Sequence, residues 1–302
     1  MKWLVQVMSR KQYVVADEIN ALNSLGFLWD DIGIIPNSPT ITNLPDILGD
    51  TNELYFLRGS IKSLRLLDEC TSLLSLNENI SSNQQKNADI YLANLKKFIF
   101  YDSIKFDQQY YSQLGLPLLN SDAAYIPLNQ SIEMRFTQDM FVKPSKDLKA
   151  FAATVLPFGL SIVEHLGYNP LIANTNNDYL LAATPKVVQH EYRFFVVGGL
   201  VVTGSQYVVN GKIQYRELNS SKEHNDAIAV ANEFAKLYQP SEIFTLDICC
   251  SNGEYFIVEY NCFHCSGLYA CDIKKIFLTV NDYCKTHINH TLVFDSLYRC
   301  VL

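Results

Sequence analysis

The sequence predicts an α/β domain followed by α+β subdomains, and three observations support this fold class. In the first third, short apolar runs alternate with apolar residues at helical spacing, which is typical of an α/β unit. In the last third, Gly198-Gly199 and Ser251-Asn252-Gly253 each separate two apolar runs, which predicts antiparallel hairpins. The length of 302 residues allows two or three lobes, at roughly 100–200 residues per domain.

The first third supplies the predicted α/β unit. Its apolar runs predict strands at residues 3–8, 32–35 and 53–57. Apolar residues recur every three or four positions before Gly26, which predicts a helix between the first two strands. Ser60 is a suitable cap for a second helix. The unit contains neither Gly-x-Gly-x-x-Gly nor a Walker A sequence, so a dinucleotide fingerprint and a P-loop are excluded.

The remaining elements follow from the same periodicities. Apolar runs predict strands at residues 97–101 and 141–144, and on both sides of each hairpin turn. An apolar stripe predicts an amphipathic helix over residues 224–238, and the tail from Asp272 onward is predicted to be largely helical.

Composition narrows the functional classes. The net charge of −7 argues against an extended nucleic-acid-binding surface. No apolar run approaches the ~20 residues that a membrane-spanning helix needs, and the first residues show no export signal. We therefore expect no membrane contact and a cytoplasmic location, which means the host cytoplasm if the chain is viral. The sequence does not indicate an oligomeric state.

The cysteines suggest a metal hypothesis of their own. Seven of the eight lie after residue 248, and Cys262-Phe263-His264-Cys265 places two around a histidine. A tetrahedral zinc site needs further ligands, which Cys249, Cys250 or Cys271 would have to supply. The simpler interpretation is reduced, mostly buried thiols. A zinc-stapled structural module remains an alternative.

The second hairpin carries acidic residues that suit a different metal. With a two-residue loop at Asn252-Gly253, Asp247 and Glu259 point to opposite sides of the sheet. With a three-residue loop that includes Ser251, the side chains of Asp247, Glu259 and Asn261 share one face. Such a set of oxygen ligands suits Mg²⁺, which would also relieve repulsion between the carboxylates. The alternative is that these are solvated polar positions on a half-exposed hairpin.

Two basic residues extend this chemistry. Lys143 ends a predicted strand, where it can reach a phosphate or remain an ordinary surface lysine. Glu191 and Arg193 alternate onto one face of the strand that enters the Gly-Gly hairpin. Because an unpaired guanidinium in an apolar strand is costly, Arg193 needs an anionic partner. That partner is either Glu191, in a structural role, or a phosphate.

In combination, these segments resemble the ATP-grasp superfamily and, more narrowly, its R2K clade, which is common in phages, large viruses and bacteria. The most specific part is Glu259-x-Asn261 followed by Ser266-Gly267-x-Tyr269-x-x-Asp272. The resemblance covers about residues 95–280, and the first 95 residues fit more loosely. The residues that carry it are Phe141-Val142-Lys143-Pro144, Lys149, Phe151, the run from Glu191 to Gly199, Asp247, and the run from Val258 to Asp272.

The resemblance implies a division of the chain and a role for each matched residue. It implies a pre-ATP-grasp α/β domain over residues 1–95, a small lid subdomain over 96–183 and a large metal-binding subdomain over 184–302, with ATP clamped between antiparallel sheets. Lys143 and Lys149 would contact ATP phosphates, and Glu191 and Arg193 would line the nucleotide site. The other implied roles are an adenine-contacting linker at Leu180, Leu181, Ala182 and Ala183, Mg²⁺ ligands at Asp247, Glu259 and Asn261, and a substrate-orienting hydroxyl at Ser266.

The implied activity is ATP- and Mg²⁺-dependent ligation of a carboxylate to an amine through an acyl phosphate, with release of ADP. Lys143 and Arg193 would stabilise the transferring phosphoryl group, so no protein nucleophile is needed. The partners would be a small-molecule or peptide carboxylate and an amine. One departure from the family pattern is that residues 145–155 contain no glycine, whereas many ATP-grasp enzymes carry a glycine-rich flap there. This motivates the alternative of a nucleotide-binding or partner-binding protein that does not catalyse.

Overall fold

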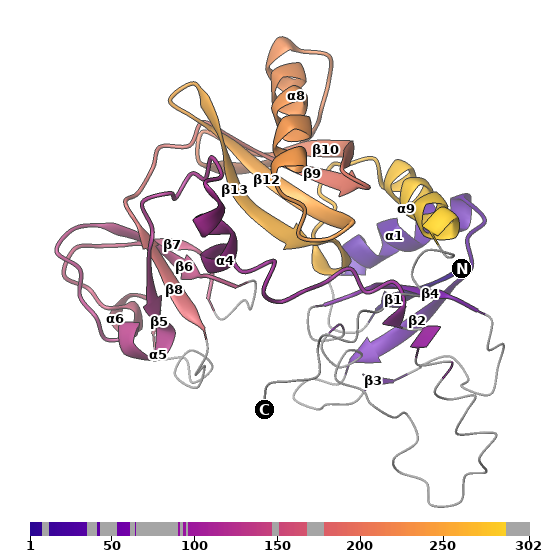
Figure 1. Cartoon of the computed structure of the whole chain (residues 1–302), viewed down its shortest axis with the longest axis horizontal. Helices are drawn as coiled ribbons and strands as arrows, with labels where there is room; N and C mark the ends of the chain where they lie inside the picture. The colour runs from indigo at the N-terminus through magenta and orange to yellow at the C-terminus, as the bar shows by residue number, and fades with distance from the viewer. Residues whose placement is uncertain are drawn as a thin grey trace, which may run out of the picture. The chain divides into compact units, whose positions relative to one another are not determined.

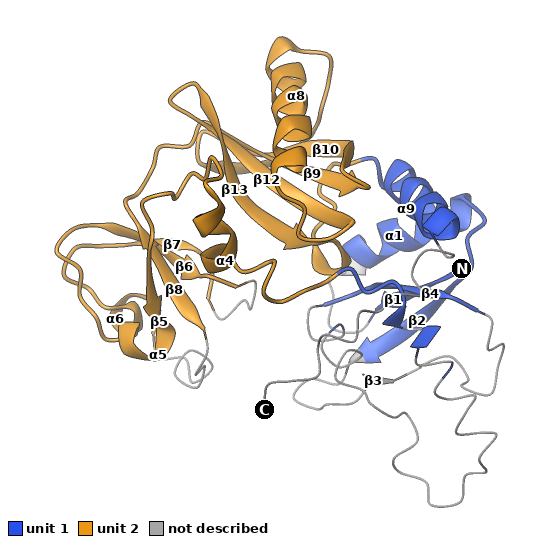
Figure 2. Cartoon of the chain, viewed as in Figure 1, with its two compact units in different colours: residues 1–100, 272–302 blue, residues 101–271 orange. Residues whose placement is uncertain are grey.

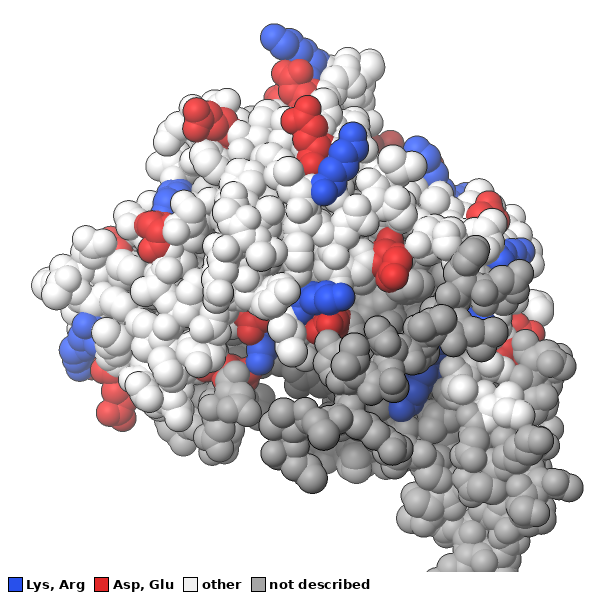
Figure 3. Space-filling model, viewed as in Figure 1, with Lys and Arg blue, Asp and Glu red and all other residues white. Residues whose placement is uncertain are grey.

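The computed structural model of the chain describes residues 1–7, 12–34, 41–42, 53–60, 64, 90, 93–94, 96–146, 151–167 and 178–287. The chain divides into two units (Figure 2): unit 1 comprises residues 1–100 and 272–302, and unit 2 comprises residues 101–271. No described helix is long and apolar enough to cross a membrane. On the face shown in Figure 3, acidic and basic side chains are interspersed among uncharged residues.

Unit 1 is built on a sheet of order β3-β2-β1-β4. Strands β2 (Trp29–Ile34) and β4 (Tyr55–Arg58) pair in parallel with β1 (Lys2–Gln6), and β3 (Ile41–Thr42) adds an antiparallel edge. The parallel connection from β1 to β2 requires a crossover, which helix α1 (Gln12–Ser24) provides. Strand β1 buries Trp3, Leu4 and Val5, so this unit has its own apolar core.

Helix α9 (Ile273–His287) completes unit 1 although it lies near the other end of the sequence. It packs against α1, as Figure 1 shows. The ring of Phe277 lies with its centroid 4.6 Å from that of Trp3. Of residues 184–302, which were expected to form one large subdomain, the part that contains α9 clusters with unit 1. The helix was predicted, but a helical apolar stripe does not say which sheet it will cover.

Unit 2 contains two sheets, and the first is a small antiparallel sheet of order β5-β8-β6-β7. Its strands are β5 (Ala124–Pro127), β6 (Met140–Pro144), β7 (Thr154–Leu156) and β8 (Tyr179–Ala183). Two short helices, α5 (Leu128–Ser131) and α6 (Ile162–Leu166), pack beside it. Together they enclose a core of Leu128, Val142, Leu156, Ile162, Leu180 and Ala182.

The second sheet of unit 2 has the order β11-β10-β9-β12-β13, and all of its neighbouring strands are antiparallel. Its strands are β9 (His190–Val197), β10 (Leu200–Val209), β11 (Lys212–Glu217), β12 (Ile243–Ser251) and β13 (Glu254–Cys262). The predicted Gly198-Gly199 turn is confirmed, with φ of 56° and 78°. Helix α8 (Lys222–Leu237) confirms the predicted amphipathic helix and buries Ala227, Ala231 and Ala235 in the core of this sheet.

Residues 101–120 pack on the large sheet, which differs from the expected lid boundary at 96. Helix α4 (Gln108–Tyr111) and the 3₁₀ helix η1 (Ser112–Leu114) lie in this segment. Phe106, Tyr111 and Leu118 belong to the large-sheet core. The backbone N–H of Leu119 donates to the carbonyl of Ile257 at 2.9 Å, which covers part of the outer edge of β13.

One predicted strand is wrong. Residues 97–101 form a turn and an irregular segment in the described structure. Phe98 is buried, and its ring stacks on Phe100 at a centroid distance of 6.3 Å. These aromatic rings pack on one another, so the apolar run reflects burial and not a strand.

Candidate functional site

The β12–β13 hairpin has a two-residue turn and a bulge. Ser251 pairs with Glu254, and the turn residues Asn252 and Gly253 have φ of 53° and 82°. Two positive φ values suit the right-handed twist of a two-residue hairpin. The pairing register then shifts by one residue between Asp247 and Ile248, which is the signature of a β-bulge.

This bulge gathers the three predicted metal ligands. After the shift, Asp247 pairs directly with Glu259, and Asn261 lies two residues further on the same strand. The Nδ2 of Asn261 lies 3.1 Å from Asp247 Oδ2 and 2.9 Å from Glu259 Oε1. Of the two loops that the sequence left open, the hairpin has the two-residue one, yet Asp247, Glu259 and Asn261 lie together as only the three-residue loop would have predicted. The extra residue sits in the strand and not in the turn.

Arg193 forms a bidentate ion pair with Asp247. The two residues are paired across β9 and β12, and the Nε and Nη2 atoms of Arg193 donate to the two carboxylate oxygens at 2.8 and 2.7 Å. Only 7% of Arg193 and 1% of Asp247 is exposed, so neither charge could remain there without a partner. Asp247 is thus the anionic partner that the sequence left open, in place of Glu191.

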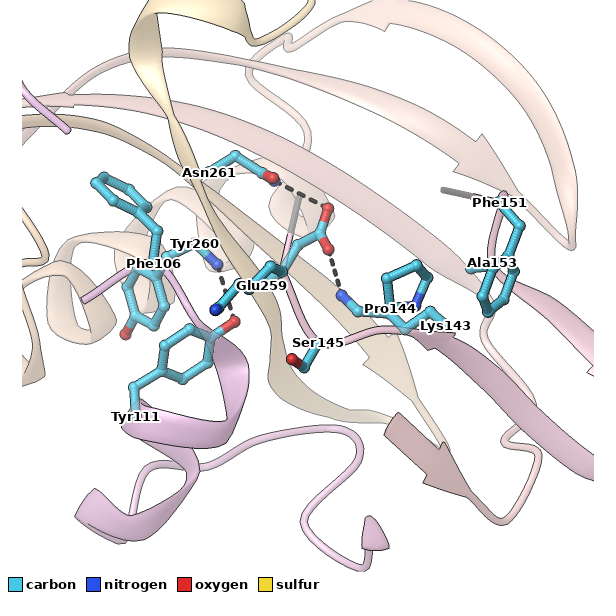
Figure 4. Close-up of a pocket in the computed structure, with 11 residues that line it drawn as sticks. Phe106, Tyr111, Lys143, Pro144, Ser145, Phe151, Ala153, Glu259, Tyr260 and Asn261 are labelled. Atoms are coloured by element: carbon cyan, nitrogen blue, oxygen red, sulfur yellow. Dashed lines mark hydrogen bonds and ion pairs between the residues drawn. The ribbon is translucent and has the colours of Figure 1, made fainter. Parts of the chain in front are cut away.

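Lys143 brings a second positive charge from the small sheet. Its Nζ lies 2.5 Å from Glu259 Oε2, and Figure 4 shows the two side chains pointing toward one another from β6 and β13. They line a pocket of about 180 Å³. The pocket wall also contains Phe106, Tyr111, Pro144, Ser145, Lys146, Phe151, Ala153, Tyr260 and Asn261.

Burial and charge act differently on the three carboxylates. Burial raises the pKa of Glu259, but the Lys143 ammonium and the Asn261 amide outweigh it and lower this pKa to about 2. Burial also raises the pKa of Asp247, against the opposing effect of Arg193. The pKa of Glu191 is raised by burial as well, although the Tyr207 hydroxyl donates to it. The site therefore holds a fixed charge at Glu259 and two carboxylates that are costly to ionise without a cation.

The other predicted site residues are placed as follows. Ser266 is buried, and its Oγ donates to the Cys262 carbonyl at 2.7 Å and lies 2.9 Å from Thr245 Oγ1. Residues 180–183 lie within β8, an inner strand whose backbone pairs with β5 and β6. They are therefore a core strand and not a linker, although Ala183 ends it. Lys149 lies outside the described residues.

The site residues fit Mg²⁺ and a phosphate group on chemical grounds. Two carboxylates and an amide on one face of the hairpin are hard oxygen donors of the kind that Mg²⁺ prefers, and two of the three residues, Asp247 and Asn261, are buried. Beside Lys143, the buried Oγ of Ser145 has no hydrogen-bond partner among the described residues. An orphaned hydroxyl on the pocket wall is a suitable donor to a phosphate oxygen.

The zinc hypothesis finds no ligand set in the described ranges. No three His, Cys, Asp or Glu side chains are grouped there in a way that would hold a metal ion. The magnesium set is of a different kind because its third member is an amide. Cys249, Cys262, Cys271 and Cys284 are buried thiols, as expected.

Sequence reasoning missed several residues at this site. Tyr111 and Phe106 reach the pocket from residues 101–120, and no local pattern announces them. Ser145 and Lys146 follow Lys143 after Pro144, so the run Lys-Pro-Ser-Lys was an available signal. Tyr207 and Tyr269 approach Arg193, with 5.9 and 4.6 Å from its Cζ to the ring centroids. Tyr269 lay inside the family-like motif but received no role.

Comparisons with known proteins address the family and the fold of this chain. The family model described as "ATP-grasp domain, R2K clade family 3" matches residues 101–280. A search of curated protein sequences finds no significant match.

Similar solved structures share the fold at low sequence identity. One is D-alanine–D-alanine ligase from Bacillus anthracis complexed with ATP, which is 13% identical with a TM-score of 0.53 over 96% of this chain and 99% of that chain. A second structure of the same enzyme is 11% identical with a TM-score of 0.51 and the same coverage. The macrocyclase MdnC from Microcystis aeruginosa MRC, bound with the precursor peptide MdnA, is 14% identical with a TM-score of 0.42 over 93% of this chain and all of that chain. The α+β architecture is the ATP-grasp fold, and the chain belongs to R2K clade family 3 of the ATP-grasp domains.

Proposed function

We propose that this protein is an ATP- and Mg²⁺-dependent carboxylate–amine ligase that works through an acyl phosphate and releases ADP. The observation that carries the proposal is the bulge that sets Glu259 and Asn261 beside Asp247, directly across the pocket from Lys143. Membership of the ATP-grasp family supports the same conclusion. This arrangement offers a magnesium ligand set and a phosphate-binding cation in one place.

Each of these residues has a role in the proposed reaction. Asp247, Glu259 and Asn261 would hold Mg²⁺, which when bound neutralises phosphate charge and aligns the phosphoryl group for transfer. Lys143 and the Ser145 hydroxyl would bind phosphate oxygens from the side of the small sheet. Arg193, kept in place by Asp247, would meet the negative charge that develops during transfer.

The chemistry needs two substrates besides ATP. A carboxylate oxygen attacks the γ-phosphorus, the bond to ADP breaks, and an acyl phosphate forms. An amine then attacks the acyl carbon, inorganic phosphate leaves with the bonding electron pair, and the amine proton passes to solvent. The remaining proposed contacts are as follows. The Ala183 end of β8 contacts the adenine, Lys149 and Glu191 contact the nucleotide, and Ser266 contacts the substrate.

A second candidate is a nucleotide-binding protein without catalytic activity. The observation that favours it is the pairing of each proposed metal-ligating carboxylate with a cation, Asp247 with Arg193 and Glu259 with Lys143. The two pairs leave the site electrically balanced without a metal. The glycine-free segment after Lys143 also supports this candidate.

Calorimetry and product analysis separate these candidates. The wild-type chain would be titrated with Mg-ATP and then incubated with panels of carboxylic acids, amino acids, peptides and amines, with ADP release as the readout. A ligase binds Mg-ATP and releases ADP only when a substrate pair is present. The double variant Asp247→Ala, Glu259→Ala should abolish that release, whereas Glu233→Gln, on an exposed position of α8, should not. Binding without ADP release across the whole panel would favour the second candidate, and wild-type release by the double variant would refute the proposed site.

A further inference from the structure

The loop over residues 266–270, which follows β13, lies over Arg193. The Nη1 atom of Arg193 donates to the carbonyl of Gly267 at 3.3 Å, and the ring of Tyr269 lies 4.6 Å from the guanidinium carbon. An aromatic face attracts a guanidinium within about 6 Å through its quadrupole. Both contacts come from the Ser-Gly-x-Tyr stretch, whose tyrosine has no role in the proposed reaction.

Tyr269 is itself held by two other tyrosines. Tyr215 of β11 stacks on it, with a centroid distance of 4.7 Å and an angle of 12° between the rings. Tyr207 of β10 lies 5.1 Å from it. The stack therefore runs from Arg193 in the middle of the large sheet to Tyr215 on the edge strand.

The backbone of the loop is fixed in a way that serves this stack. Tyr269 has φ of 49°, which is unusual for a residue with a side chain. The N–H of Ala270 donates to Ser205 Oγ at 3.3 Å, which anchors the loop to β10. A Cβ at Gly267 would lie 3.1 Å from the Tyr269 ring, so a glycine there leaves room for the ring. Ser266 fixes the start of the loop through the Cys262 carbonyl.

These contacts fix the orientation of the Arg193 guanidinium. Asp247 and the Gly267 carbonyl bind its edges, and the Tyr269 ring covers one face. Arginine has five N–H donors in a rigid fork. Asp247 takes two of them and the Gly267 carbonyl takes one. The bonds named leave one N–H on Nη1 and one on Nη2 for a ligand. A rigid fork with two remaining donors is preorganised for an oxyanion.

We infer that Tyr269, supported by Tyr215, is a positioning residue for Arg193, and that this is the purpose of the Ser-Gly-x-Tyr stretch. Ser266 and Gly267 shape the loop, and the Tyr269 ring fixes the guanidinium plane. The inference deepens the proposed function, because it gives Arg193 a fixed direction toward the phosphoryl group. The positioning itself is a property of the free chain and can be measured without nucleotide.

The first test is NMR of the arginine side chains in the full chain, with the Arg193 Nε–H signal assigned from Arg193→Lys. A proton near the face of a ring is shifted by the ring current. The chemical shift of the Arg193 Nε–H proton should therefore stay the same in Tyr269→Phe and change in Tyr269→Leu. Hydrogen exchange of this N–H should also speed up in Tyr269→Leu. Tyr255→Leu is the matched control, because Tyr255 packs in the core with α8. An unchanged Arg193 signal in Tyr269→Leu would overturn the inference.

The second test is the affinity for Mg-ATPγS, measured by calorimetry. Tyr269→Leu should weaken binding roughly 2- to 30-fold, the range expected for a cation–π contact. Tyr269→Phe and Tyr255→Leu should stay close to wild type. Equal affinity of Tyr269→Leu and wild type would count against positioning. If the wild type itself does not bind Mg-ATPγS, the proposed function fails and the NMR result alone decides the inference.

A further variant covers the case in which Tyr269→Leu does not fold. Tyr215 is 56% exposed, so Tyr215→Leu should leave the fold intact. It should move the Arg193 signal and the affinity in the same direction as Tyr269→Leu, by a smaller amount. If neither the Arg193 signal nor the affinity changes in Tyr215→Leu, Tyr215 does not support Tyr269. If Tyr269→Leu also fails to fold, that result rejects the inference.

Discussion

Lys143 in β6 and Glu259 in β13 form an ion pair, so the proposed phosphate ligand on the small sheet neutralises a proposed metal ligand on the large one. The 2.5 Å contact is only partly screened by water, with side-chain exposures of 13% and 30%. In this pair, the Glu259 carboxylate occupies the place at Lys143 that a phosphate would take, and the Lys143 ammonium occupies the place at Glu259 that a metal ion would take. Binding of Mg-ATP would have to exchange both partners.

This exchange predicts opposite effects of Lys143→Met on two ligands. The variant should weaken Mg-ATPγS binding roughly tenfold or more, because a charged hydrogen bond to phosphate is lost. It should strengthen binding of Mn²⁺ alone, because Glu259 is released. Calorimetry and electron paramagnetic resonance would measure the two affinities. Lys212→Met, on an exposed position of β11, should change neither, and weaker binding of both ligands by Lys143→Met would contradict the exchange.

The Arg193–Asp247 pair predicts a non-additive stability effect. Asp247→Leu leaves a buried guanidinium unpaired, which should cost about 3–5 kcal/mol of unfolding free energy. The double variant Arg193→Met, Asp247→Leu removes both charges and should be more stable than Asp247→Leu alone. Urea unfolding of the two variants and the wild type would measure this. A double variant less stable than the single one would show that the pair is not the main source of the loss.

The lowered pKa of Glu259 predicts a stability difference that depends on pH. Because its folded-state pKa of about 2 lies below the unfolded value, ionised Glu259 stabilises the fold above the unfolded pKa, and this contribution disappears as pH falls toward 2. Glu259→Gln should therefore be less stable than wild type at pH 6, and the gap should close in acid. Urea unfolding without added metal would show it. A gap of constant size between pH 6 and 3 would be inconsistent with the lowered pKa, and Glu233→Gln provides the exposed control.

The cysteines should differ in reactivity toward iodoacetamide. Burial raises the pKa of the Cys249 and Cys284 thiols to about 12, so little of the reactive thiolate exists at pH 8. Cys250 and Cys265 are partly exposed and should be modified before Cys249 and Cys284. Mass spectrometry of peptides from the folded protein would give the order. Modification of Cys249 before Cys265 would show that the β12 strand opens more readily than its burial indicates.

Periodicity and turn chemistry predicted most of the fold. The Gly198-Gly199 and Asn252-Gly253 turns were readable because glycine and asparagine accept the positive φ that such turns require. The helix over residues 222–237 was readable from its apolar stripe. These features depend on neighbouring residues in the sequence, which is why a single sequence reveals them.

The site was predicted less completely because long-range contacts build it. The face shared by Asp247 and Glu259 depends on a bulge that no residue type marks, so the sequence suggested the right face through the wrong loop. The partner of Arg193 lies 54 positions away, on a strand whose neighbours the sequence does not specify. Family resemblance pointed to Asp247, Glu259 and Asn261 as proposed ligands, and the register of β9, β12 and β13 shows how these side chains meet.

The position of α9 has a consequence for synthesis on the ribosome. Unit 1 is formed by segments that precede and follow unit 2 in the sequence, and Trp3 of β1 contacts Phe277 of α9. Chains emerge from their first residue, so every strand of unit 2 is made before α9 is available. The ring of Trp3 therefore lacks its contact with Phe277 until all of unit 2 has been translated. The lobe that is translated first is the one that can be completed last.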